Sequence, residues 1–233
     1  MKANKSNYRA IGFCSHIPLQ ASLRQLLCEM VTDNIWSRPQ KVEGNRILYS
    51  ASRGLHKVAA TIREDDKLMQ LLQDAMMPLD DDDFEGDGVR LMAVQRIVAP
   101  SGAEPQTLHR DISSEGLRMP FQTSTLIVST NDTDIRTRIH PRSHLEIHRS
   151  RQHTRTRGTN ELHQRETHVV VPGGTSTLYD SYIYHGGGAV PPQAQEDSSR
   201  VFLFFMRDGL PDYQRALILT SNYETAHKKG VRL

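Results

Sequence analysis

The sequence predicts a mainly β protein, a β-sandwich or jelly roll, preceded by a helix-rich N-terminal part. From Gly88 onward, short runs rich in β-branched and aromatic residues alternate with turns that contain Gly, Pro or Asn-Asp. Before Gly88, apolar residues recur at spacings of three and four, as in amphipathic helices. The chain of 233 residues can bury a sizeable core, and we expect one domain with helical support over 1–87, a sheet core over 88–207 and a tail over 208–233.

Composition argues against several classes of protein. The net charge of +2 is too small for the field of the whole chain to favour nucleic acid, and no apolar run approaches the length of a membrane span. Cys14 and Cys28 form no metal or disulfide pattern, which favours free thiols in a reducing compartment. We therefore expect a cytoplasmic protein, while the basic, acid-free first 28 residues leave an organelle-targeting signal open.

Three helices are expected in the first third of the chain. Apolar residues at helical spacing fall in three stretches, 19–30, 55–62 and 68–75. Pro18 suits the first turn of the first helix, and Asp65-Asp66 would cap the third. Short strands are expected over 10–13 and 47–49. The acidic run 80–87 lacks the order of an EF-hand, so it predicts a solvated loop rather than a calcium site.

The sheet core is predicted from β-branched and aromatic runs bounded by turns. Strands are expected over 89–98, 107–112, 123–130, 167–171, 176–185 and 200–206. Turns are expected at 139–144 and at Pro172-Gly173-Gly174. The even spacing of these strands is what favours a sandwich or jelly roll.

The stretch Gln106-Thr107-Leu108-His109-Arg110-Asp111 carries the main candidate site. On a strand, alternate side chains share a face, so His109 and Asp111 would present an imidazole nitrogen and a carboxylate oxygen to one point. Two histidines and one carboxylate form the facial triad that holds non-haem Fe(II) with open positions for O2 and substrate. The pair therefore predicts a third ligand far away in the sequence.

His185 is the expected third ligand. It ends an apolar strand and is followed by three glycines, which allow close approach of backbone and ligand. Counting back by two, Ser181 and Tyr179 would line the same cavity. Arg200 begins the last apolar strand, where a guanidinium is costly unless it meets an anion, and its planar fork matches a carboxylate such as that of a 2-oxo acid.

The C-terminal two-thirds resembles the phytanoyl-CoA dioxygenase family of Fe(II)/2-oxoglutarate-dependent oxygenases. The blocks that carry the resemblance, in the family's order, are 106–111, 131–134 with 141–144, 174–188 and Arg200. Three residues depart from the family's pattern: Arg142 replaces a Gly, Gly187 replaces a Ser or Thr that often helps to hold 2-oxoglutarate, and Ile127 stands near a usual Trp.

The resemblance implies a double-stranded β-helix, a jelly roll of the cupin type. It implies Fe(II) held by His109, Asp111 and His185, and 2-oxoglutarate with its far carboxylate on Arg200. Thr125 and Gln95 are further candidates for contact with the co-substrate. With O2, such enzymes release succinate and CO2 and hydroxylate a C–H bond. Related halogenases lack the carboxylate ligand, so the presence of Asp111 favours hydroxylation.

Two alternatives remain open at this stage. One is a catalytically silent jelly-roll binding module. The other is a Zn(II) hydrolase, since two histidines and an aspartate also suit zinc. Arg200 argues against zinc chemistry, because a hydrolase has no need for a carboxylate clamp at that position.

The segment 148–168 is rich in Arg and His and cannot bury a core of its own, so it predicts an exposed loop. Either it is a solvated insertion, or it is a lid that attracts an anionic small-molecule substrate. A nucleic acid is not expected as the partner, because the loop lacks aromatic residues for stacking.

Overall fold

The computed structural model describes residues 5–76, 88–111, 122–130, 134–148, 166–210 and 230–233. The helices in these ranges are α1 (Lys5–Ile11), α2 (Ala21–Thr32), α3 (Leu55–Arg63), α4 (Asp66–Met76) and the 3-10 helix η1 (Ser143–His148). The strands are β1 (Phe13–Pro18), β2 (Gln40–Val42), β3 (Arg46–Ser50), β4 (Val89–Ala99), β5 (Thr123–Ser129), β6 (Ile135–Ile139), β7 (Thr167–Val171), β8 (Thr175–Asp180), β9 (His185–Gly187), β10 (Ser198–Arg207) and β11 (Val231–Arg232).

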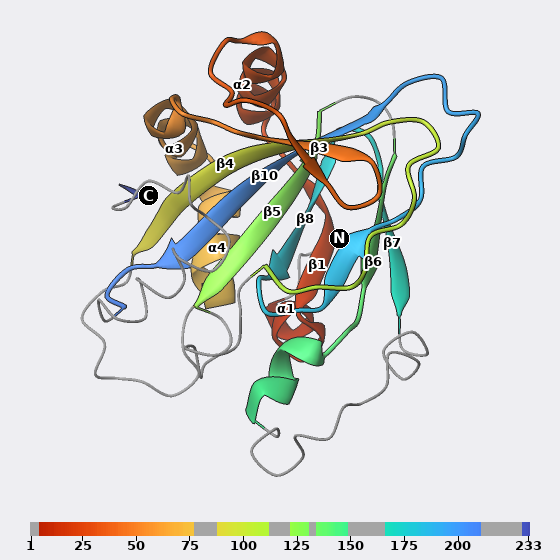
Figure 1. Cartoon of the computed structure of the whole chain (residues 1–233). Coiled ribbons are helices and arrows are strands. Elements are labelled where there is room, and N and C mark those ends of the chain that lie inside the picture. The colour runs from red at the N-terminus through yellow and green to blue at the C-terminus, as the bar shows by residue number, and fades with distance from the viewer. Residues whose placement is uncertain (1–4, 77–87, 112–121, 131–133, 149–165, 211–229) are drawn as a thin grey trace.

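Two antiparallel sheets form the core of the fold. The large sheet has the order β1-β8-β5-β10-β4-β3-β2, with β11 added beside β4, and the small sheet has the order β7-β6-β9. Figure 1 shows the large sheet as a twisted surface with the small sheet at one side. The expectation of a mainly β jelly roll with an N-terminal helical part is therefore confirmed.

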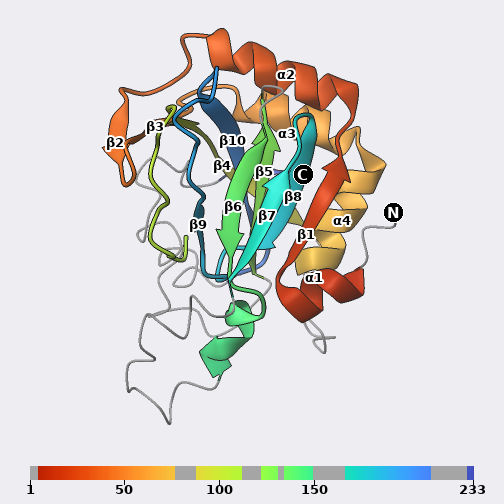
Figure 2. The same cartoon turned by 90° about the vertical axis from the view of Figure 1, so that its right-hand side faces the viewer.

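The large sheet is covered on both faces, which explains why all seven residues of β5 are buried. Leu126 and Val128 pack with the apolar residues of α2, α3 and α4, whereas Ile127 packs with Ile135 and Val171 of the small sheet. This alternation follows from the period of two along a strand. The helices and the small sheet consequently lie on opposite sides of the large sheet (Figure 2).

The helices α2, α3 and α4 correspond to the three predicted helices, whereas α1 was not predicted. The helix α4 buries Leu68, Leu71 and Leu72, and its start is capped as expected, because Oδ1 of Asp65 accepts a 3.1 Å hydrogen bond from the backbone N–H of Leu68. The prediction for Pro18 was wrong: Pro18 ends β1, and α2 begins at Ala21.

The strand expected over 10–13 was also wrong. Residues up to Ile11 belong to helix α1, and the strand β1 begins at Phe13. Gly12 separates the two elements with a φ of 89°, a left-handed conformation that side-chain-bearing residues disfavour. The sequence signal at Gly12 was a break between elements rather than the middle of a strand.

Two other expected strands near the candidate site differ from the structure. The described part of 107–112 has no regular strand pairing and carries a single bridge, between His109 and His185. The strand expected over 176–185 is interrupted by a turn at 181–184, so β8 lies in the large sheet and β9 in the small one. The turn at 181–184 thus marks the point where the chain passes from the large sheet to the small one.

Parts of three predictions lie outside the described residues: the acidic loop over 80–87, the Arg/His-rich segment between 149 and 165, and most of the tail. Within the described ranges, no helix is long and apolar enough to span a membrane.

Candidate metal centre

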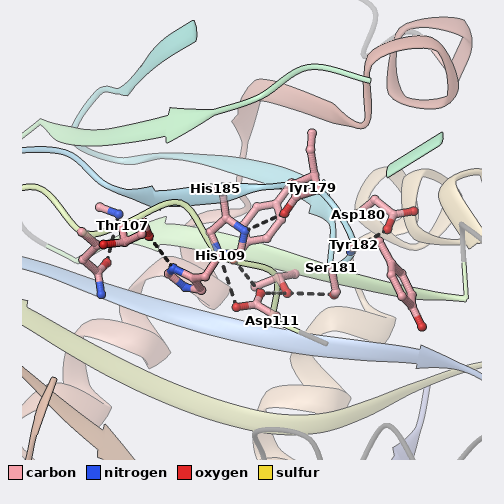
Figure 3. A network of polar contacts seen from close by, with 12 residues as sticks. Thr107, His109, Asp111, Tyr179, Asp180, Ser181, Tyr182 and His185 are labelled. Atoms are coloured by element: carbon pink, nitrogen blue, oxygen red, sulfur yellow. Dashed lines mark hydrogen bonds and ion pairs between the residues drawn. The ribbon is translucent and has the colours of Figure 1, made fainter. Parts of the chain in front are cut away.

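His109, Asp111 and His185 come together at one point between the two sheets. Their ligand atoms all lie within 4.8 Å of one another, as the sequence predicted. The backbones of His109 and His185 are paired by two hydrogen bonds, of 2.8 and 2.9 Å, between their N–H and C=O groups. Figure 3 shows the two imidazoles and the carboxylate converging.

Both imidazoles are oriented in the same way. Nδ1 of His109 lies 2.9 Å from the carbonyl oxygen of Thr107, and Nδ1 of His185 lies 3.0 Å from that of Ile183. A carbonyl only accepts, so each Nδ1 carries a proton, and Nε2 is the nitrogen of each ring that can bind a metal ion when it is unprotonated. A backbone carbonyl behind the ring is the arrangement that fixes the tautomer of a metal-binding histidine.

The carboxylate of Asp111 is oriented by two hydroxyl groups. Oδ2 accepts hydrogen bonds from Tyr179 Oη at 2.9 Å and from Thr125 Oγ1 at 3.1 Å. Oδ1 lies 3.3 Å from Nε2 of His185. Oδ2 thus faces the two hydroxyl donors, and Oδ1 faces Nε2 of His185, which places Oδ1 on the side of the histidine cluster.

Asp111 is a carboxylate at neutral pH, which favours a cation at the cluster. Burial opposes the charge on Asp111, but His185 and His109 outweigh it and lower the pKa of Asp111 to about 2. Burial and the neighbouring His185 lower the pKa of His109. Burial likewise opposes protonation of His185, but Asp111 raises its pKa. A proton on His185 thus partly neutralises Asp111, and a metal ion would displace it.

The segment that carries His109 and Asp111 is held in place although it is not a regular strand. The Glu43 carboxylate accepts hydrogen bonds from the backbone N–H of Thr107 at 3.0 Å and from its hydroxyl at 2.5 Å. Arg138 donates to the carbonyl of Gln106 at 2.9 Å, and the N–H of Gln106 donates to Gly187 at 2.9 Å. Side chains therefore replace the missing strand ladder.

A cavity adjoins the cluster. It is lined by all three triad residues and by the three other side chains singled out in the sequence, Gln95, Thr125 and Arg200. The cavity also contacts Gln106, which the sequence analysis quoted without giving it a role. The predicted site residues are thus brought together, with Thr125 bonded to Asp111 and to Ser181.

Arg200 is a buried cation with few partners. The residue is 4% exposed, and among the described residues its hydrogen-bond acceptor is Oε1 of Gln106, 3.5 Å from Nη2. Its guanidinium carbon lies 5.2 Å from the centre of the Phe202 ring, and Nε has no hydrogen-bond partner among the described residues. Burial, with Arg46 nearby, lowers the pKa of Arg200 to about 10, so it remains a cation at neutral pH.

Arg46 is the residue at this site that sequence reasoning missed. It begins β3, directly before Ile47-Leu48-Tyr49, and is 1% exposed. Its positive charge helps to lower the pKa of Arg200. The signal was available, because an arginine at the start of an apolar strand was the argument used for Arg200. Its distance of 154 positions from Arg200 along the chain hid the relationship.

The three departures from the family pattern have different physical settings. Arg142 adopts a φ of 69°, a conformation that favours the glycine it replaces. Gly187 has no room for a side chain, since a Cβ would lie 2.6 Å from Nη2 of Arg200 and 2.7 Å from Oε1 of Gln106. Ile127 lines the cavity with an apolar surface.

The donor set fits a divalent metal ion. Two neutral imidazole nitrogens and one carboxylate oxygen suit Fe(II) with open coordination positions, and the same set also suits zinc. The buried cation Arg200 in the same cavity adds a place for a carboxylate, which a metal site alone would not require.

Comparisons with known proteins relate this chain to others through structure alone. No protein-family model matches the sequence, and no curated protein matches it. Solved structures do match. SnoN, a non-heme alpha-ketoglutarate-dependent epimerase from nogalamycin biosynthesis in complex with Fe3+, alpha-ketoglutarate and nogalamycin RO, matches with a TM-score of 0.59 at 14% identity, over 87% of this chain and 81% of SnoN.

Two further structures have the same character. SnoK, a non-heme alpha-ketoglutarate-dependent carbocyclase, has a TM-score of 0.57 at 17% identity, over 88% of this chain and 83% of its own. HygX from Streptomyces hygroscopicus, with nickel and 2-oxoglutarate bound, has a TM-score of 0.56 at 14% identity, over 86% of this chain and 85% of HygX. At these identities the likeness concerns the fold: the chain has the jelly-roll architecture of these 2-oxoglutarate-dependent enzymes.

Proposed function

We propose that this protein is an Fe(II)- and 2-oxoglutarate-dependent oxygenase. The observation that carries the proposal is that a His-Asp-His cluster and a buried arginine without a carboxylate partner among the described residues line one cavity. Neighbours in fold with iron or nickel and 2-oxoglutarate bound support the same assignment. Membership of the phytanoyl-CoA dioxygenase branch remains a prediction from the four sequence blocks.

His109, Asp111 and His185 are the proposed metal ligands. The Nδ1 hydrogen bonds to backbone carbonyls would leave Nε2 of each imidazole as the ligand atom, and Tyr179 and Thr125 hold the carboxylate of Asp111 with Oδ1 toward His185. Bound iron with 2-oxoglutarate and O2 would supply an oxidation that couples loss of CO2 and formation of succinate to attack on a C–H bond.

Arg200 is the proposed partner for the far carboxylate of 2-oxoglutarate. Its planar fork can donate two hydrogen bonds to one carboxylate, and burial strengthens such a pair. Gln95 lines the same cavity and is proposed as a further polar contact. The rings of Phe202 and Phe204 also line the cavity and would exclude water from the carbon chain of the co-substrate.

Hydroxylation of a small, anionic molecule is the proposed reaction. The neighbours include an epimerase and a carbocyclase, and structures containing nogalamycin RO or hygromycin B, so the fold accommodates small molecules and several oxidations. The anionic preference rests on the Arg/His-rich sequence between 149 and 165, which lies outside the described residues. We propose that this segment contributes to substrate choice.

Release of succinate from 2-oxoglutarate tests the proposal. We expect Fe(II)- and O2-dependent succinate release that rises when the correct compound is included in a panel of matched anionic and neutral small molecules. Arg200→Met should abolish turnover while sparing iron affinity, and Arg200→Lys should retain part of it, because charge survives but the fork is lost. Wild-type affinity for 2-oxoglutarate in Arg200→Met would contradict the role of Arg200.

A further inference from the structure

Arg46 is a second buried arginine beside the proposed co-substrate site. Its guanidinium is held by three backbone carbonyls: those of Gly44, at 3.4 Å, Glu104, and Gly188, at 2.6 Å. Its Nε has no hydrogen-bond partner among the described residues. The side chain is therefore fixed in position by its two terminal nitrogens, while Nε makes no hydrogen bond to the described residues.

Arg46 and Arg200 approach each other across Gly187. The point where a Cβ of Gly187 would lie is 2.6 Å from Nη2 of Arg200 and 2.9 Å from Nε of Arg46. Only a residue without a side chain leaves room for both guanidinium groups there. Both arginines also line a second cavity, which shares Arg200 with the cavity that holds the triad.

Nearby carboxylates only partly offset the two positive charges: Glu43 acts to raise the pKa of Arg46 and Asp111 that of Arg200, but burial outweighs both. Neither forms an ion pair with a carboxylate among the described residues, and burial lowers the pKa of both, with Arg46 adding to the effect on Arg200. Taking two like charges out of water side by side is unfavourable unless an anion compensates them. Among the described residues, the groups that accept hydrogen bonds from the two guanidinium groups are backbone carbonyls and the amide oxygen of Gln106, none of which carries a full negative charge.

We propose that Arg46 is a specificity-determining residue, which makes the site select a doubly charged 2-oxo dicarboxylate over a singly charged 2-oxo acid. Arg200 would contact the distal carboxylate. Arg46 would act through its positive charge and through its hydrogen bonds to the backbone carbonyls of Glu104 and Gly188. This inference rests on the proposed function, because it assigns Arg46 to the co-substrate end of the same site.

The selectivity between two ligands of equal length measures this role directly. Anaerobic Fe(II)-loaded protein is titrated with 2-oxoglutarate and with its neutral-ended 5-amide, 2-oxoglutaramate, and the ratio of the two dissociation constants is determined from the visible absorption of the complex. Arg46→Gln should reduce the preference for 2-oxoglutarate by about tenfold. Arg136→Gln is the matched control, since Arg136 lines the second cavity but is exposed, and it should leave the ratio unchanged.

Arg46→Lys separates charge from structure. At neutral pH it should keep most of the preference, and the preference should fall as pH rises, because a buried lysine loses its proton where the wild-type arginine does not. This pH profile decides the question even where Arg46→Gln does not fold.

The outcomes are distinguishable. An unchanged ratio in Arg46→Gln, or equal weakening of both ligands in Arg46→Gln and Arg46→Lys with a flat pH profile, would overturn the inference and leave Arg46 a structural residue. Absence of any saturable complex in the wild-type protein would overturn the proposed function, and this inference with it.

Discussion

The hydroxyl of Tyr179 donates a 2.9 Å hydrogen bond to Oδ2 of Asp111. The same hydroxyl lies 3.2 Å from Nε2 of His185, so one side chain of β8 touches two members of the proposed metal triad (Figure 3). The turn at 181–184 is what allows this contact, because it brings His185 back over the residue that precedes it by six positions.

Replacing Tyr179 by Phe should weaken metal binding without unfolding the protein. Loss of a hydrogen bond to a ligand typically lowers metal affinity by about 10- to 100-fold, while the ring remains to fill the core. Competition with a coloured chelator for Co(II) measures the affinity. Tyr182→Phe is the control, since its buried hydroxyl has no partner among the described residues, and it should bind Co(II) like the wild type.

Thr125 should act on the metal site rather than on the co-substrate. Its hydroxyl donates to Asp111 at 3.1 Å and lies 3.1 Å from Ser181 Oγ, so both roles of the hydroxyl are in use. We expect Thr125→Val to lower Co(II) affinity several-fold, and Thr125→Ser to restore it, because serine keeps the donor. A weaker 2-oxoglutarate affinity with unchanged metal affinity in Thr125→Val would instead favour the role suggested by the sequence.

Arg142→Gly should stabilise the protein. Arg142 has a φ of 69°, and a left-handed conformation costs a residue with a side chain on the order of 1 kcal/mol relative to glycine. The free energy of unfolding in urea should rise by about that amount. Arg136→Gly, at an exposed position of β6, is the matched control and should lower the free energy of unfolding. An equal decrease in the free energy of unfolding in both variants would contradict the strain at Arg142.

Stability should fall in mild acid because of His144. Burial lowers the pKa of His144 to about 4, so the folded state resists a proton that the unfolded chain accepts near pH 6.5. The contribution to stability is complete above pH 6.5 and is lost progressively down to about pH 4, with a size on the order of 3 kcal/mol.

Urea unfolding at several pH values checks this. His144→Gln keeps a donor for the carbonyl of Arg9, which accepts from Nε2 at 3.3 Å, and it should flatten the pH dependence between 6.5 and 4. His56→Gln, on the exposed face of α3, controls for removal of an imidazole. The same slope in His144→Gln as in the wild type would show that other groups cause the loss.

The sequence predicted the composition of the candidate site better than its geometry. The four site residues could be found because each breaks a local pattern. His109 and Asp111 are polar ligands two positions apart, His185 ends an apolar run, and Arg200 is a charge at the start of one. The strand argument used for His109 and Asp111 was only partly right. The segment is held by Glu43, which accepts a hydrogen bond from Thr107, and by Arg138, which donates one to Gln106.

Long-range relationships were beyond a local reading. The turn at 181–184 was hidden, because Ser181 to Tyr184 has the polar and aromatic content of a strand, and the strand β6 is too polar to stand out. Arg46 carried the same local signal as Arg200, but only the pairing of β3 with β4 and of β4 with β10 places it near the cavity. Register between distant strands is set by tertiary packing.

The central claim is that one cavity binds Fe(II) and 2-oxoglutarate together. Anaerobic addition of both to the purified protein measures this without knowledge of the substrate. We predict a visible charge-transfer band that saturates with 2-oxoglutarate in the wild type, is lost in His185→Ala, and requires far more 2-oxoglutarate in Arg200→Met. Absence of the band in a folded wild-type protein that binds Fe(II), or a band in Arg200→Met with wild-type affinity, would contradict the account.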